Sequence, residues 1–268
     1  MISVILFIEK KARSIEKRYR FTLSTLLVAG VMFVSTFFRF DTAMYFIPIF
    51  ILVAYVATYF SVLEGIEKIE WFMLFLMPVA LLISFYFFYF LFPVRWLTRL
   101  PFLIVFAVSV YAILLSSNIF NVGVEKSLQL YRAAFSVNYL YQTLIMFLTL
   151  NVVFSLNLNF ALNALIVFAI SFVLSLQLFW TIKLKLSVER EIVYFAFFLS
   201  YLLSQVALAL SFVPLNTSIF ALFLTASYYS LAGLMYTHLD QRLFKETMRE
   251  YLIVLGFVLL IVLLSLNW

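Results

Sequence analysis

The polar side chains that could carry chemistry gather in one stretch of the chain, between residues 116 and 136. On a continuous helix turning 100° per residue, six of them fall within an arc of about 80° and would form one polar face. These six are Asn118, Asn121, Glu125, Gln129, Arg132 and Ser136. Apolar residues from Val124 to Phe135 repeat on a different face, which predicts an interfacial amphipathic helix near residues 119–134.

Two interpretations of this polar face remain open. Glu125 and Arg132 could simply meet water and lipid head groups, or Asn118 and Asn121 could line a polar vestibule. His238, the single histidine, could cap the end of a helix, where a cation is favoured, or act as a general base. The candidate polar site therefore consists of Asn118, Asn121, Glu125, Gln129, Arg132 and His238, and no catalytic, metal-binding or cofactor-binding residue is assigned.

The composition decides the broad class of this protein. Of its 268 residues, 66% are apolar and 11% are charged, whereas soluble domains carry about 25% charged residues. So few charges cannot coat a water-soluble particle. The absence of cysteine excludes disulfides, thiolate metal sites and a cysteine nucleophile, and a single histidine excludes the HExxH zinc motif. We expect an integral membrane protein without a cofactor.

Nine segments are long enough to cross the hydrocarbon core of a bilayer, which takes roughly 20 helical residues. They cover residues 21–38, 43–62, 71–92, 101–118, 135–156, 160–181, 192–212, 218–237 and 251–267. The sequence thus predicts an all-α, polytopic membrane helix bundle of about nine transmembrane helices.

The distribution of cations predicts the orientation. With the N-terminus in the cytoplasm, fifteen of the 18 Lys and Arg residues fall on the inner side, and Arg39, Arg95 and Arg99 fall outside. Residues 1–20 are interpreted as a basic amphipathic segment on the membrane surface, and residues 21–268 as a single transmembrane domain with an outer C-terminus. Anionic lipid head groups are the expected partners of the inner cations, and nucleic acid is not expected.

Neutral amides and small residues lie inside several predicted spans. The amides are Asn138, Gln142, Asn151, Gln177 and Gln205. In lipid such amides usually form hydrogen bonds between helices. Along span 192–212 the small residues Ala196, Ser200, Ser204, Ala207 and Ser211 follow one face. This strip predicts the close approach of a neighbouring helix.

Several segments in the second half resemble one family. They are AsnIlePheAsnVal at 118–122, LeuTyrArgAlaAla at 130–134, TrpThrIleLysLeu at 180–184, LeuAlaLeuSerPheValPro at 208–214 and ArgLeuPheLysGluThrMetArgGluTyrLeu at 242–252. Together they resemble an uncharacterised family of multi-pass membrane proteins from candidate phyla radiation (Patescibacteria) bacteria, over roughly residues 111–268. The resemblance implies a bacterial plasma-membrane location, and it supplies no catalytic residues to transfer to this chain.

Three classes of function stay open. The first is a non-catalytic membrane subunit or scaffold, with a membrane-protein partner or a second copy of the chain. The second is a transporter or channel for a small solute, which needs a cavity reaching Asn118, Asn138 or Gln205. The third is a lipid-handling enzyme or flippase, which needs Glu125, Arg132 and His238 close together.

Overall fold

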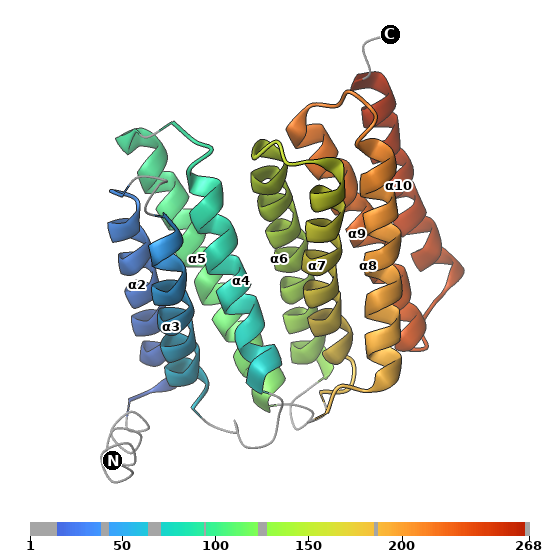
Figure 1. Cartoon of the computed structure of the whole chain (residues 1–268). Helices are drawn as coiled ribbons and strands as arrows, with labels where there is room; N and C mark the ends of the chain where they lie inside the picture. Colours follow the sequence, from blue (N-terminus) through green and yellow to red (C-terminus); the bar gives the residue numbers. More distant parts are fainter. Residues whose placement is uncertain are drawn as a thin grey trace. The chain divides into compact units, whose positions relative to one another are not determined.

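The computed structural model describes residues 15–38, 43–63, 71–93, 95–122, 128–184 and 187–265. Within these ranges the chain forms nine α-helices and no strand (Figure 1). The helices are α2 (Lys17–Ser35), α3 (Ala43–Val62), α4 (Trp71–Tyr89), α5 (Trp96–Val122), α6 (Leu128–Ser155), α7 (Phe160–Trp180), α8 (Arg190–Leu210), α9 (Thr217–Leu239) and α10 (Lys245–Ser265).

Eight of the described helices, α3 to α10, are long and apolar enough to cross a membrane. Lipid offers no partner to backbone N–H and C=O groups, so a spanning segment must satisfy them within its own helix. Helix α2 differs because Lys17, Arg18 and Arg20 occupy its first turn, which shortens its apolar part. The predicted fold class, an all-α bundle of membrane helices, is confirmed.

Some helices are longer than the apolar segments that predicted them. The expected span 101–118 lies within α5, and the span 135–156 begins seven residues after the start of α6. A helix need not end where the hydrocarbon ends, because interfacial turns can continue it into the head-group region. Residues 1–14 of the predicted surface segment and residues 123–127 of the predicted interfacial helix lie outside the described residues.

The contacts of the chain form two compact units, residues 1–141 and 142–268, with the division inside α6. The single transmembrane domain expected from the sequence stays a prediction.

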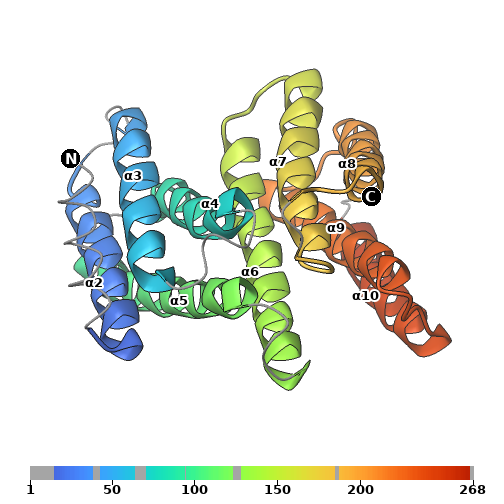
Figure 2. The same ribbon diagram turned by 90° about the horizontal axis from the view of Figure 1, so that it is seen from below.

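In the first unit, α2 and α4 each pack against both α3 and α5 (Figures 1 and 2). Hydroxyl groups join α2 to α3: Ser61 Oγ donates to Ser24 Oγ at 2.9 Å, and Ser24 Oγ donates to the Ala57 carbonyl at 3.0 Å. Met32 and Phe50 are fully buried in this unit. The four helices therefore share an apolar interior with a polar tie between two of them.

Arg99, on α5, is held by aromatic side chains in this unit. Its guanidinium carbon lies 4.7 Å from the centroid of the Phe37 ring and 5.3 Å from that of Trp96, and its Nε donates to the Tyr89 hydroxyl at 2.9 Å. Planar guanidinium groups stack on aromatic faces in this way, whereas an ammonium group cannot stack and lacks the Nε donor. Arg99 thus connects the turn that follows α2 to α4 and α5.

We expect Arg99→Lys to lower the free energy of unfolding by about 1 kcal/mol, because it removes the stacking and the hydrogen bond to Tyr89 while keeping the charge. Unfolding titrations in mixed micelles measure this change. Arg95→Lys is the matched control, since Arg95 is exposed and its side chain makes no hydrogen bond, ion pair or ring contact within the described residues. Equal effects of the two substitutions would contradict a specific role for the stacked guanidinium.

In the second unit, α7 packs closely against α8, and α9 contacts α7, α8 and α10. The connections α6–α7 and α8–α9 lie at one end of this unit, and α7–α8 and α9–α10 lie at the other (Figure 1). Leu199 and Leu224 are fully buried here. The two ends differ in chemistry, because the charged residues Lys183, Glu189 and Arg190 and the charged segment 238–249 all belong to the second of them.

Candidate functional site

The polar face expected between residues 118 and 136 is divided between α5 and α6. Asn118 is half-buried and Asn121 is buried, both in the last two turns of α5, whereas Gln129 and Arg132 are exposed in the first turns of α6. Glu125 lies outside the described residues. Since the connection between the helices is not described, a continuous polar face stays a prediction.

Asn121 makes an identifiable contact with another helix. Its Nδ2 donates to the carbonyl oxygen of Val62, the last residue of α3, at 3.2 Å. The last four carbonyls of a helix lack partners within that helix, so a side-chain donor stabilises the helix end. Asn121 therefore caps α3 from α5.

His238 lies in the last turn of α9, where the sequence placed it, and its side chain is exposed. Gln241, just beyond the helix, has a left-handed φ of 56°, and its N–H donates to the His238 carbonyl at 3.0 Å. This arrangement ends α9 with a standard C-terminal motif. The lipid-enzyme alternative, which needs His238 beside Glu125 and Arg132, stays a prediction.

Arg20, which the sequence placed in the surface segment, is only 1% exposed, in the first turn of α2. Arg18, two residues earlier, is exposed. Buried cations near a membrane helix end are uncommon and are functional candidates by default. The position of Arg20 could not be read from the sequence, because a basic run does not show which of its members turns inward.

The most connected polar cluster in the described structure lies inside the second unit. Gln142 of α6 is fully buried, and its Nε2 donates to the Leu174 carbonyl of α7 at 3.0 Å and to Gln177 Oε1. The hydroxyl of Tyr228, on α9, donates to Gln142 Oε1 at 3.0 Å. One glutamine thereby joins three helices.

This cluster can stabilise the bundle, but it offers little to a solute. Gln142 uses both N–H groups and accepts one hydrogen bond, so its amide is nearly saturated. Gln177 and Tyr228 are 2% and 0% exposed, and neither reaches open space. The sequence predicted that the two glutamines form hydrogen bonds between helices, but it did not single out Tyr228. The chain has 16 tyrosines, and no sequence pattern distinguishes Tyr228 from the others.

The other expected amide ties have different positions. Asn151 is buried but donates to the Phe147 carbonyl of its own helix at 2.8 Å. Gln205 is exposed on α8 and has no hydrogen bond within the described residues, so the expectation that it joins helices is wrong. Asn138 is buried one turn before Gln142 on α6.

The strip of small residues on α8 packs as predicted. Ala196, Ser200 and Ala207 are 0% exposed. Ser204 Oγ donates to the Ala164 carbonyl of α7 at 3.1 Å, which requires the two backbones to lie close together. Small side chains permit this approach in membrane helices.

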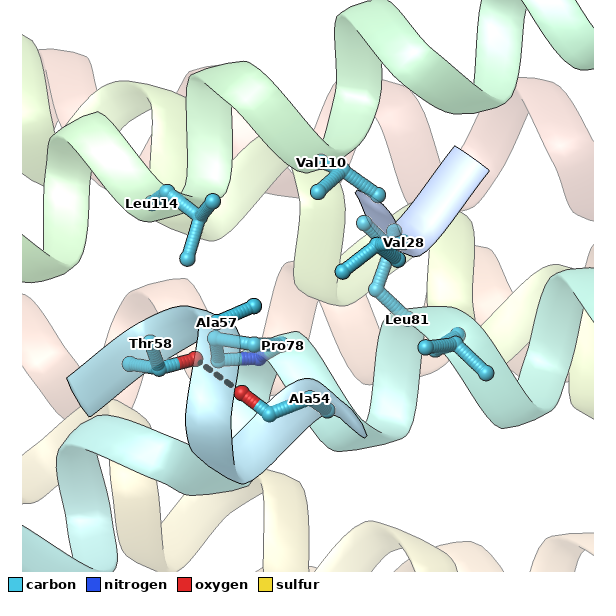
Figure 3. A pocket seen from close by; sticks show the side chains of 9 residues that line it. Val28, Ala54, Ala57, Thr58, Pro78, Leu81, Val110 and Leu114 are labelled. Carbon is cyan, nitrogen blue, oxygen red and sulfur yellow. Dashed lines mark hydrogen bonds between the residues drawn. The ribbon is translucent and has the colours of Figure 1, made fainter. Parts of the chain in front are cut away.

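Figure 3 shows a void inside the first unit, bounded by α2, α3, α4 and α5. Its volume is about 10 Å³, near the lower limit for holding one water molecule. Val28, Pro78 and Val110 are among its apolar walls, and the Thr58 hydroxyl donates to the Ala54 carbonyl of its own helix at 2.7 Å. A void of this size and polarity cannot hold a solute.

Charged groups of the second unit pair outside the membrane-spanning helices. Lys183 Nζ lies 2.5 Å from Glu189 Oε2, and this hydrogen bond raises the pKa of Lys183 above its usual value. Arg242 pairs with Asp240 at 3.4 Å. Among the described residues, no three His, Cys, Asp or Glu side chains gather as a metal site would require. Exposed pairs of this kind contribute little to stability.

Comparison with known protein families finds a match over the second half of the chain. The model of a family described as protein of unknown function (DUF5656) matches residues 129–265, just over half of the chain. The match begins at the second residue of α6 and ends at the last residue of α10. No curated protein and no solved structure matches the chain. The matched region thus covers the five helices α6 to α10, which contain the Gln142 cluster.

Proposed function

The chain belongs to the DUF5656 family of proteins of unknown function, and from this premise we propose that it is a non-catalytic subunit or scaffold of a membrane assembly. Eight helices apolar enough to span a bilayer fit an integral, multi-pass membrane protein. The proposed role is to present a stable helical surface to another membrane helix.

The internal polar groups support a packing role. In the matched region, Gln142, Gln177 and Tyr228 hydrogen-bond one another or the backbone instead of facing a cavity. A transport path would need such groups to face a solute. The void in the first unit is not lined by Asn118, Asn138 or Gln205, and neither is a cleft in the second unit beside Phe154 and Phe220.

The observation that carries the proposal is the surface of α10. Only Val258 and Val262 of this helix are buried, and both lie on the same face, one turn apart. The opposite side exposes Phe257 and Leu264, which are 63% and 77% exposed. A Cβ added at Gly256 would meet no atom within 4 Å apart from its chain neighbours and the backbone of its own helix. A small residue on an otherwise bulky apolar face allows a second membrane helix to approach.

We place the protein in the plasma membrane of a bacterium, as its resemblance to one family from the candidate phyla radiation implies. The inner side would then carry the cationic segments near residues 183–190 and 238–249, which attract anionic lipid head groups by about 1 kcal/mol per nearby cation. In this proposal the attraction sets the orientation and the depth of the protein in the bilayer, and the partner helix packs against α10.

A cross-linking experiment tests the surface of α10. Because the chain has no cysteine, Gly256→Cys introduces the only thiol of the protein. We expect a thiol cross-linker applied to intact membranes to join this position to a second copy of the chain or to another membrane protein, and the mass of the product tells which.

Val258→Cys is the matched control, because Val258 lies two residues away on the face that is buried within the chain. It should give no intermolecular product. Equally strong cross-linking at Val258 and Gly256 would refute the proposed partner surface. So would the recovery of only monomeric protein with both variants, if the introduced thiols still react with a small lipid-soluble reagent.

A further inference from the structure

A cleft of about 250 Å³ opens at the end of the second unit where the α6–α7 and α8–α9 connections meet. Its walls combine the rings of Phe154 and Phe220 with four polar side chains. The polar side chains are Asn157, Asn163, Ser211 and Thr217. At about 30 Å³ per water, the volume equals that of roughly eight water molecules, which suits a single small ring or head group.

The cleft is electrically neutral. Residues 154–163 and 210–220, which contain the whole lining, include no Lys, Arg, Asp, Glu or His. The charged groups of this unit, such as Lys183 and Arg242, belong to the connections at the other end. Neither a phosphate nor a cation would find a counter-charge in this cleft, so its ligand is uncharged.

The hydrogen-bonding groups of the wall can both accept and donate. Asn163 Nδ2 donates to the Leu158 carbonyl at 3.2 Å, and Ser211 Oγ donates to the Ala207 carbonyl at 2.8 Å. Asn157 Nδ2 donates to the Ser155 carbonyl at 3.5 Å. Each of these bonds uses a single N–H or O–H, so Asn157 keeps a second amide N–H, and the side-chain oxygens of Asn157 and Ser211 can still accept hydrogen bonds. The side-chain oxygen of Asn163 is shielded from solvent and accepts no hydrogen bond within the described residues.

The aromatic pair gives the cleft an apolar floor. The Phe154 and Phe220 rings stack in parallel, with centroids 4.2 Å apart and an interplanar angle of 1°. Such a pair joins α6 to α9 and offers carbon surface to the C–H groups of a ligand. The combination of neutral hydrogen-bonding groups, an apolar floor and no charge matches a molecule that carries several hydroxyl groups on a carbon ring, because hydroxyl groups both donate and accept.

We propose that this cleft binds an uncharged sugar or polyol, supplied by the head group of a membrane lipid or by the free molecule. The hydroxyl groups of the ligand exchange hydrogen bonds with the side chains of Asn157 and Ser211, and its ring lies against the two phenylalanines. The excess of cations at the opposite end predicts that the cleft faces the outside of the cell.

Binding can be measured with the full chain in phosphatidylcholine nanodiscs, because maltoside detergents carry the proposed ligand group themselves. The probes are a monoglucosyl diacylglycerol, the anionic lipid phosphatidylglycerol, and free glucose, and native mass spectrometry reports the bound lipid. We expect the glucolipid to bind and phosphatidylglycerol not to compete. If free glucose competes with the glucolipid, the sugar alone is sufficient for binding. If glucose does not compete while the glucolipid binds at the cleft, the ligand is a lipid.

Two variants tie the binding to the cleft. Asn157 has a left-handed φ of 50°, so Asn157→Gly keeps the backbone while removing the amide, and we expect about fivefold weaker binding. Ser211→Phe fills the cleft and should abolish binding. Asn216→Ser is the matched control, because Asn216 is exposed at the same end, does not line the cleft, and its side chain does not cap α9.

The unchanged far-UV circular dichroism and elution volume of each variant show that it folds. Glucolipid binding that survives Ser211→Phe in the folded protein would overturn the proposal. So would the absence of binding by both glucolipid and glucose, or a preference for phosphatidylglycerol.

Discussion

Replacing Gln142 with leucine is expected to lower the free energy of unfolding by about 2 to 3 kcal/mol. Three hydrogen bonds disappear with the amide, and bonds between membrane helices contribute about 0.6 kcal/mol on average, up to about 1.7. The substitution also leaves the Tyr228 hydroxyl and the Gln177 oxygen buried without this partner, which adds a further penalty. Reversible unfolding in mixed micelles, followed by circular dichroism, measures the change.

Gln205→Leu provides the same chemical change at an exposed position of α8, where the amide has no hydrogen bond within the described residues. We expect this control to change the free energy of unfolding by less than about 0.5 kcal/mol. If both leucine variants lose the same stability, the loss reflects the removal of an amide in general, and the Gln142 cluster has no special role.

Tyr228→Phe separates the contribution of one bond, because it deletes only the hydroxyl that donates to Gln142. Alone it should reduce stability by about 1 kcal/mol. Combined with Gln142→Leu, it should add almost nothing, since the partner is already gone. Additive losses in this double-mutant cycle would show that the two side chains are not coupled.

The helices could be predicted because hydropathy and length determine which segments can span a bilayer. The expected span 43–62 coincides with α3, and 160–181 differs from α7 by one residue. The ends of α5 and α6 could not be predicted in this way, because their outer turns are polar and continue the helix beyond the apolar segment. Apolar length predicts where a helix must exist, and leaves open how far it extends.

The candidate site was harder to predict, because most of these helices are apolar on all sides. In such a helix no hydrophobic face indicates which side is buried, so residue type alone could not separate Gln142 from Gln205. Gln142 lies at the centre of a cluster, whereas Gln205 is exposed. The cleft beside Asn157 was missed for a related reason, since it forms where two connections distant in sequence meet.

The strip of small residues on α8 could be predicted because their spacing itself defines a helical face. Steps of three and four residues put Ala196, Ser200 and Ala207 on one side, and all three are buried as expected. Small residues repeated along one helical face therefore predict where another helix packs. Amides scattered over several helices do not indicate which side of a helix is buried.

Replacing Ala207 with leucine tests how closely α7 and α8 depend on this strip. Ala207 is 0% exposed, and Ser204, one turn earlier, bonds directly to the backbone of Ala164. A leucine has no room between backbones that approach so closely, so α7 and α8 would have to separate and the hydrogen bond would lengthen. We expect the free energy of unfolding to fall by about 2 to 3 kcal/mol.

Ala209→Leu is the matched control, because Ala209 lies two residues further along α8 and is exposed. A leucine there faces outward and should change the free energy of unfolding by less than about 0.5 kcal/mol. The ratio between the two effects then separates packing from helix propensity, since the same substitution occurs in the same helix. A loss at position 209 equal to that at position 207 would mean that the bulk of leucine acts through the helix itself, and that α7 does not press on this face of α8.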